Sequence, residues 1–234
     1  LPRPEADTHK YRRGHVAVFS GGPSATGAAR LAARGALRIG AGAVTVLSPA
    51  AAMAVNAMHL TAIMLKRVEE AAELAAFQHE RAPQAYVLGP GFGVGEKARA
   101  FVETLLHPRD KESGASLVLD ADGITSFANS RDRLFKAVKA SGGDVVLTPH
   151  PGEFKRLFPD LAGNAQSKLE MAREAARLSG AIVLAKGPDT VIAAPDGEAV
   201  INANGTPYLA TAGSGDVLAG MIAGLLGQGM PAFA

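Results

Sequence analysis

The hydrophobic positions of the chain fall into short apolar runs that alternate with longer, Ala-rich stretches. Short runs rich in Val, Ile and Leu are typical of strands, whereas apolar residues that recur at helical spacing predict helices. We expect strands at residues 15–20, 44–47, 85–88, 117–119, 145–147, 182–185, 190–194 and 199–201. We expect helices at residues 26–39, 50–57, 69–79, 96–106, 168–178 and 216–226.

This alternation predicts an α/β fold, with a mostly parallel sheet that carries helices on both faces. Asp196-Gly197, between the last two expected strands, is the strongest hairpin signal in the chain, so the sheet is expected to gain antiparallel strands late. Residues 111–114 are expected to form a surface loop. Because no internal repeat, low-complexity tract or linker interrupts the sequence, we predict one domain over residues 1–234.

Composition narrows the functional classes. Of 234 residues 47% are hydrophobic, which is enough to build a core, and 46 are alanine, which favours a core of small, closely packed residues. Lys and Arg number 24 against 22 Asp and Glu, a near balance that argues against nucleic acid or a membrane surface as the partner. The absence of Cys excludes disulfides and a Cys nucleophile and fits a cytoplasmic setting. No apolar run reaches the ~18 residues of a membrane span.

Unusual residues gather at the turns that follow the expected strands. In open α/β sheets, ligands bind beyond the carboxyl ends of the strands. We therefore expect these turns to form one site. Their sequences are GPGFG (residues 89–93), DADG (120–123), TPHPGE (148–153), AKGPDT (185–190) and, before the last expected helix, TAGSGD (211–216).

The last of these turns carries the most chemistry. Gly213, Ser214 and Gly215 precede a helix, where glycines allow close approach and successive N–H groups favour an anion such as phosphate. Asp216 would lie in the first helical turn, where it can accept a proton from a hydroxyl group. The alternative is that Asp216 only complements the helix dipole, and the pattern alone leaves both open.

Two further turns have two interpretations each. GPGFG can cradle a substrate or simply connect a strand to a helix; it has neither the spacing of a Rossmann fingerprint nor the Gly-Lys-Ser/Thr of a Walker loop. His150 lies between two prolines, a rigid setting that suits a ligand contact, although a lone His is more often a structural hydrogen-bonding group. His150 and Glu153 lack metal-ligand spacing.

The remaining two turns are equally open. Asp120 and Asp122 can hold Mg²⁺ through water or cap the next helix, and capping is the commoner role. Lys186 with Thr190 can bind phosphate or can be an ordinary surface pair.

Taken together, the motifs resemble those of the ADP/ATP-dependent NAD(P)H-hydrate dehydratases, a family of the ribokinase-like superfamily. GSGD alone would indicate only the superfamily, but the whole set occurs in one order over nearly the whole chain. The matching stretches are HKYRRG (residues 9–14), 16–22, TGAA (26–29), GPGFG (89–93), LDADG (119–123), LTPHPGEF (147–154), KGPDT (186–190) and NGTPYLATAGSGDVLAG (204–220).

The resemblance implies a ribokinase-like three-layer α/β/α sandwich and a carbon–oxygen lyase that repairs hydrated NADH or NADPH. ADP or ATP would phosphorylate the hydroxyl of the hydrate, with Mg²⁺ bridging the phosphates and Asp216 as the base. Residues that match hydrate-contacting positions are Ala28, Gly93, His150 and Asp216. Residues that match the nucleotide-binding strings are Lys186, Gly187, Pro188, Asp189, Thr190, Gly213, Ser214 and Gly215.

The same resemblance carries expectations about assembly. It implies a homo-oligomer, a tetramer, and a fused or separate NAD(P)H-hydrate epimerase. The family continues with further helices beyond the GSGD helix, so we expect a chain clipped at its C-terminus. Because the sequence opens on Leu1, we also expect the C-terminal part of an epimerase fusion, itself without epimerase activity.

Two rival functions remain. A kinase for a vitamin-precursor alcohol, of the hydroxyethylthiazole or hydroxymethylpyrimidine type, would share GSGD and the fold. HPGE (residues 150–153) and KYRRG (residues 10–14) favour the dehydratase instead. A non-catalytic nucleotide-binding module would not need Asp216 as a base.

Overall fold

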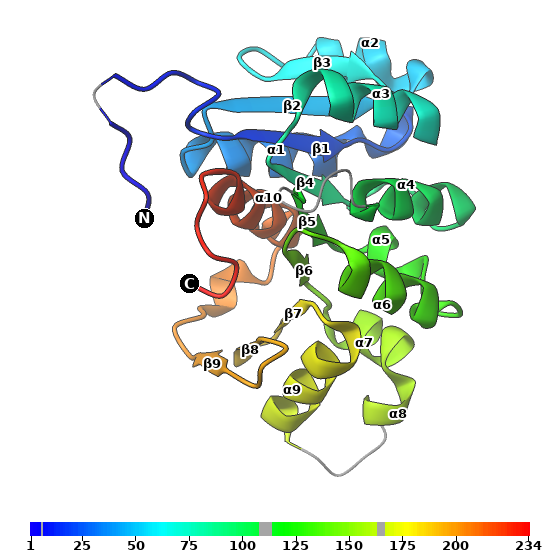
Figure 1. The fold of residues 1–234 in the computed structure, drawn as a ribbon, viewed down its shortest axis with the longest axis vertical. Coiled ribbons are helices and arrows are strands. Elements are labelled where there is room, and N and C mark those ends of the chain that lie inside the picture. The colour runs from blue at the N-terminus through cyan, green and yellow to red at the C-terminus, as the bar shows by residue number, and fades with distance from the viewer. Residues whose placement is uncertain (6, 108–113, 163–166) are drawn as a thin grey trace.

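The computed structural model describes residues 1–5, 7–107, 114–162 and 167–234. Within these residues one nine-stranded sheet runs through the molecule in the order β3-β2-β1-β4-β5-β6-β7-β8-β9 (Figure 1). The strands are parallel from β3 to β7, whereas β7, β8 and β9 pair antiparallel. Their bounds are β1 His15–Phe19, β2 Ala43–Ser48, β3 Met64–Arg67, β4 Ala85–Leu88, β5 Ser116–Leu119, β6 Val145–Leu147, β7 Ile182–Ala185, β8 Thr190–Ala193 and β9 Ala199–Asn202.

Helices cover both faces of the sheet, so the predicted three-layer α/β/α sandwich is confirmed. Helices α1 and α10 pack on one face, and α3, α4, α6 and α9 pack on the other (Figure 1). The helices are α1 Thr26–Arg38, α2 Met53–Ala57, α3 Ala71–Arg81, α4 Glu96–Leu106, α5 Asp122–Thr125, α6 Arg131–Ala140, α7 Pro151–Leu157, α8 Pro159–Ala162, α9 Lys168–Ser179 and α10 Ser214–Gly227. Short 3₁₀ turns are η1 Pro23–Ala25, η2 Ala50–Ala52 and η3 Pro207–Leu209.

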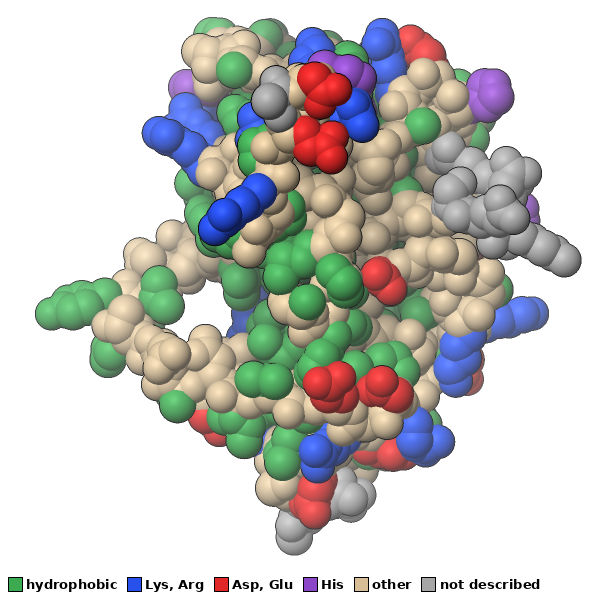
Figure 2. All heavy atoms as spheres, turned by 60° about the vertical axis from the view of Figure 1, so that its left-hand side comes forward, with side chains coloured by type: hydrophobic (Ala, Val, Ile, Leu, Met, Phe, Trp, Pro, Cys, Tyr) green, Lys and Arg blue, Asp and Glu red, His purple; other side chains and the backbone are tan. Residues whose placement is uncertain are grey.

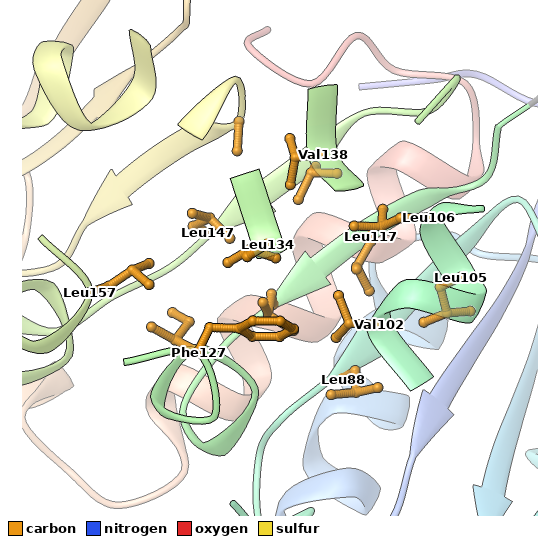
Figure 3. Packing of buried hydrophobic residues seen from close by; sticks show 14 of the residues in the cluster. Leu88, Val102, Leu105, Leu106, Leu117, Phe127, Leu134, Val138, Leu147 and Leu157 are labelled. Atoms are coloured by element: carbon orange, nitrogen blue, oxygen red, sulfur yellow. The ribbon is translucent and has the colours of Figure 1, made fainter. Parts of the chain in front are cut away.

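Each central strand is buried on both faces because its side chains alternate between two cores. In β1, Val16 and Val18 face α1 and α10, whereas Ala17 and Phe19 face the opposite helices. The larger core is shown in Figure 3, where leucines of β4, β5 and β6 lie among apolar side chains of α4 and α6. The labelled members on these elements are Leu88, Leu117, Leu147, Val102, Leu105, Leu106, Leu134 and Val138.

Small residues bring the backbones of α1 and α10 into contact. A Cβ on Gly220 would lie 1.9 Å from the Ala32 carbonyl oxygen, and a Cβ on Gly224 would lie 2.8 Å from that of Ala36. The two helices run parallel, since residue numbers increase together along the contact. Their N-termini therefore lie at the same end, at the carboxyl edge of the sheet. The Gly- and Ala-rich composition of α10 is explained by this close approach.

The late hairpin is confirmed: β8 and β9 pair through Ile192 and Val200, and Gly197 in their turn has φ +95°. The sequence prediction missed β3, an exposed four-residue edge strand of mixed polarity, and α6, whose Leu134 and Val138 are its buried residues. It also missed α7, because Pro and Gly are typical of loops, although Pro is favoured in the first turn of a helix.

Part of the loop expected at 111–114, residues 111–113, lies outside the described residues. Among the described residues no helix is both long and apolar enough to cross a membrane.

Candidate functional site

The turns singled out in the sequence meet at the carboxyl edge of the sheet. A Cβ on Gly89, after β4, would lie 1.8 Å from the carbonyl oxygen of Asp120, after β5. The Lys186 amide, after β7, donates to the Pro149 carbonyl, after β6, at 2.9 Å. A Cβ on Gly215 in α10 would lie 3.5 Å from the Lys186 Nζ atom. The expectation of one shared edge is therefore confirmed by direct contacts.

The N-terminus of α10 has the geometry of an anion cradle. Gly213 is the N-cap residue with φ +88°, a left-handed conformation that favours glycine. Ser214 and Gly215 follow as the first helical residues, and the Ser214 hydroxyl donates to the Thr211 carbonyl at 2.9 Å. The Ser214 amide donates a long bond to the Thr211 carbonyl at 3.4 Å. Free amide groups in the first turn of a helix, together with the helix dipole, attract phosphate.

Asp216 lies beside this cradle in the first turn of α10 and is partly buried. Burial raises the pKa of its carboxyl group, the Asp120 charge raises it further, and the Lys186 ammonium partly lowers it. A carboxylate that served only the helix dipole would have a lowered pKa. A raised pKa is the property that a proton acceptor at this position requires.

Asp120, which is buried, and Lys186, which is partly exposed, form an ion pair at the carboxyl edge of the sheet. The Lys186 Nζ atom donates to Asp120 Oδ1 at 2.7 Å, and the Asp120 side chain is 3% exposed. Of the two roles left open for Asp120, capping of the next helix is not the one observed: the N-cap residue of α5 is Ala121, which makes no side-chain capping bond. No sequence pattern predicts this pairing, because Asp120 and Lys186 are 66 positions apart.

Residues 186–190 form a tight turn that closes on itself. The Thr190 hydroxyl donates to the Gly187 carbonyl at 2.8 Å and accepts from the Gly187 amide at 3.3 Å. Pro188 and Asp189 are exposed. Lys168, the first residue of α9, donates to Asp189 Oδ1 at 2.8 Å and lowers the pKa of that carboxyl group. Sequence reasoning missed Lys168, which no motif marks.

The GPGFG turn lies against the start of α1. A Cβ on Gly91 would lie 3.5 Å from Ala25 Cβ and 3.7 Å from Ala28 Cβ, which brings Ala28 close to this turn. The Gly93 amide donates to Asp122 Oδ2 at 2.9 Å. Asp122 therefore fixes the GPGFG turn rather than capping α5.

His150 caps helix α7. Its Nδ1 atom accepts from the Gly152 amide at 2.9 Å, and its own amide donates to Glu153 Oε2 at 2.8 Å. The Nε2 atom lies 3.2 Å from Glu153 Oε1, and the side chain is half exposed. His150 thus has the structural role that was weighed against ligand binding, and its ring is half exposed at the carboxyl edge.

The HKYRRG stretch does not join the other motifs. It precedes β1 and lies at the amino edge of the sheet, where the Arg13 and Gly14 carbonyls accept from the Gly42 amide at 3.2 and 3.0 Å. A Cβ on Gly42 would lie 1.9 Å from the Lys10 carbonyl oxygen. This motif therefore packs against the turn before β2 and does not reach the carboxyl edge.

Comparisons with known proteins agree with this arrangement. The NAD(P)H-hydrate dehydratase family model matches residues 16–234. The bifunctional NAD(P)H-hydrate repair enzyme Nnr of Moorella thermoacetica is 41% identical over 98% of this chain and 44% of its own length. The ADP-dependent (S)-NAD(P)H-hydrate dehydratase of Neisseria meningitidis is 35% identical over 97% of this chain and 74% of its own length.

A solved structure of a related enzyme has the same fold. The ADP/ATP-dependent NAD(P)H-hydrate dehydratase from Bacillus subtilis, co-crystallized with ATP/Mg²⁺, superposes with a TM-score of 0.80 at 31% identity, over 97% of this chain and 76% of that one. This chain thus spans less than half the length of the bifunctional relatives. The family match, the fold and the order of the motifs together establish that the chain belongs to the NAD(P)H-hydrate dehydratase family.

Proposed function

We propose that the chain catalyses the nucleotide-dependent dehydration of (S)-NAD(P)H-hydrate to NAD(P)H. The observation that carries this proposal is the position of Asp216. A carboxyl group of raised pKa lies in the first turn of a helix whose N-terminus begins with glycine and serine, with a lysine ammonium close by. A base, an anion cradle and a cation are the parts that phosphoryl transfer to a hydroxyl group requires.

In this mechanism Asp216 takes the proton of the hydrate hydroxyl as its oxygen attacks the terminal phosphorus of the nucleotide. A new oxygen–phosphorus bond forms, and the bond from that phosphorus to the bridging oxygen of the nucleotide breaks. The carbon–oxygen bond of the ring then breaks with loss of phosphate, and the adjacent ring carbon loses a proton. The amides of Gly213, Ser214 and Gly215 offset the charge on the transferred group.

The nucleotide would bind along Lys186, Gly187, Pro188, Asp189 and Thr190, whose turn is closed by the Thr190 hydroxyl. The hydrate would contact Ala28, Gly93 and His150, which border the same edge. Either ADP or ATP is a suitable donor in this proposal, since relatives are named for both.

Mg²⁺ fits this site as a partner of the nucleotide. Among the described residues there is no group of three or more His, Asp or Glu side chains that could hold a metal ion. Mg²⁺ commonly keeps several waters and binds substrate phosphates instead. We therefore assign no protein residue as its ligand, and its role would be to neutralise phosphate charge.

The test is recovery of the reduced-nicotinamide absorbance from NADH-hydrate or NADPH-hydrate with Mg²⁺ and either ADP or ATP. Recovery that depends on one nucleotide would support the reaction and identify the donor. Asp216→Asn should abolish turnover while nucleotide still binds, because only the proton acceptor is lost. Unchanged turnover in Asp216→Asn would remove the assigned base.

The setting of the reaction is also part of the proposal. We place the chain in the cytoplasm, as one domain that works with an epimerase for the same damaged cofactor. We also propose that it assembles as a homo-oligomer, specifically a tetramer. Self-association is supported by apolar side chains that are exposed on β9 and η3, among them Tyr208 at 91% and Leu209 at 59%. Figure 2 shows hydrophobic side chains gathered on the face where α10 and the β8–β9 hairpin lie. Sedimentation equilibrium of wild type and Tyr208→Asp tests the assembly.

A further inference from the structure

Asp120 is the most deeply buried acidic group at the carboxyl edge of the sheet among the described residues. Its backbone is fixed on both sides: the amide donates to the Leu88 carbonyl at 3.2 Å, and the carbonyl accepts from the Gly123 amide at 2.9 Å. Gly89 packs against the same carbonyl so closely that no Cβ would fit. The Asp120 carboxylate therefore has a position set by the sheet.

The two oxygens of this carboxylate face two parts of the site. Oδ1 accepts the 2.7 Å hydrogen bond from Lys186, and Oδ2 lies 3.8 Å from the place where a Cβ on Gly215 would be. A lysine ammonium has three N–H donors, so one bond to Asp120 leaves two for a ligand. The Lys186 side chain is 22% exposed, so its ammonium is partly open to the site.

We propose that Asp120 is a positioning residue that holds the Lys186 ammonium beside the α10 cradle. Its negative charge also makes the Asp216 carboxylate a stronger base. This inference rests on the proposed function and extends it to a residue that would not contact the substrate. A long, flexible lysine loses side-chain entropy when it is fixed on a phosphate. Asp120 would fix it before the nucleotide arrives.

The charges around Asp216 make the proposal specific. Asp120 raises the pKa of Asp216, and Lys186 lowers it. Helix α1, which packs against α10, carries Arg30, Arg34 and Arg38, and Arg30 donates to the Thr26 carbonyl of its own helix at 3.3 Å. Replacing Asp120 by Asn would remove the like charge and release Lys186 toward Asp216. Both changes lower the pKa of Asp216, so the base becomes weaker.

The first variant to test is Asp120→Asn, with Asp160→Asn as its matched control. Asp160 also forms an ion pair, with Arg131 at 2.6 Å, but on the exposed surface of α8. We expect Asp120→Asn to raise the nucleotide KM, to lower kcat by about 100-fold because the cation is misplaced, and to move the acid limb of the kcat profile to lower pH. The control should match wild type in all three.

A second variant covers the case in which Asp120→Asn does not fold, since it leaves a partly buried ammonium unpaired. Asp120→Asn with Lys186→Gln leaves no unpaired charge. If Asp120 acts through Lys186, this double variant will have the same nucleotide KM as Lys186→Gln alone. The acid limb of its kcat profile will still lie at lower pH than that of Lys186→Gln, because the Asp120 charge is gone. Additive losses in KM would overturn the positioning role, as would a folded Asp120→Asn with unchanged KM, kcat and acid limb.

Failure of the proposed function is distinguishable from failure of this inference. If wild type restores no NAD(P)H with ADP or ATP, the dehydratase reaction is refuted. The Asp120 inference would still be tested by calorimetric binding of ADP with Mg²⁺ and by ¹³C titration of the Asp216 carboxyl group. Weaker binding and a lower Asp216 pKa in Asp120→Asn would support it, and no change in either would refute it.

Discussion

A Gly→Ala substitution at two positions of α10 should have opposite effects on stability and on turnover. Gly215 and Gly220 lie on the same helix, but their surroundings differ. A Cβ on Gly215 would meet Lys186 Nζ at 3.5 Å and Asp120 Oδ2 at 3.8 Å, which are ordinary contacts. A Cβ on Gly220 would lie 1.9 Å from the Ala32 carbonyl oxygen, about an ångström closer than any ordinary contact.

These distances give opposite stabilities. Gly→Ala at a compatible helical position stabilises by about 0.4–1 kcal/mol, or about 1–4 °C in Tm for a domain of this size. Gly215→Ala should therefore be as stable as wild type or more so. Gly220→Ala must push α1 and α10 apart, and overpacking costs about 1–3 kcal/mol, which corresponds to a Tm lower by about 2–12 °C.

Activity should follow the other order. The new methyl group of Gly215→Ala occupies the space beside the cradle amides, where the transferred group would lie. The methyl group would displace the transferred group from the cradle amides, which themselves remain. A misplacement of about 1 Å costs about 100-fold in rate, and we expect a fall in kcat of that order. Scanning calorimetry and the NAD(P)H-recovery assay, run on both variants, measure the two effects. A stable Gly215→Ala with wild-type turnover would refute the cradle, and an equally stable Gly220→Ala would refute the helix contact.

Two further predictions use groups away from the cradle. Burial lowers the pKa of His15 below its ordinary value of 6.5, and its Nε2 atom is 2.8 Å from Thr45 Oγ1. The unfolded chain therefore binds the proton more readily, so the free energy of unfolding should fall as the pH drops below 6.5, by no more than about 1.4 kcal/mol per pH unit. His15→Gln should remove this slope in the free energy of unfolding between about pH 7.5 and about pH 5. If the slope persists in the variant, another group causes it. Thr190→Val should lose about 1 kcal/mol with its two hydrogen bonds and raise the nucleotide KM more than it lowers kcat, whereas Thr190→Ser, which keeps the hydroxyl, should behave as wild type; equal effects of both would exclude the hydroxyl.

The parallel core and the shared edge of turns could be predicted because each is a local pattern repeated along the chain. Apolar runs such as that of β1 need no knowledge of their partners to be recognised as buried strands. The pairing of Asp120 with Lys186 is different, since it depends on β6 and β7 lying beyond β5 in the sheet. The contact of Lys168 with Asp189 could not be predicted for the same reason, since it requires the 186–190 turn to fold back onto the start of α9.

The HKYRRG motif shows a limit of another kind. By its place in the order of motifs it resembles the family, and this resemblance favours the dehydratase over a kinase. Its hydrogen bonds to Gly42 place it away from the turns. The matching family model covers residues 16–234 and does not include this stretch. A motif can therefore meet a structural requirement of the fold and carry no information about the reaction.

The glycine contact between α1 and α10 has a consequence for the rate of the proposed reaction. The start of α1 borders the turn assigned to the hydrate, and the start of α10 carries the cradle assigned to the phosphoryl group. Because the two backbones touch, the spacing between acceptor and donor is set when the protein folds and needs no closing movement of either helix. The enzyme would then bind its two substrates at a fixed separation, and the resulting effective concentration of one toward the other is a property of the packing between two helices.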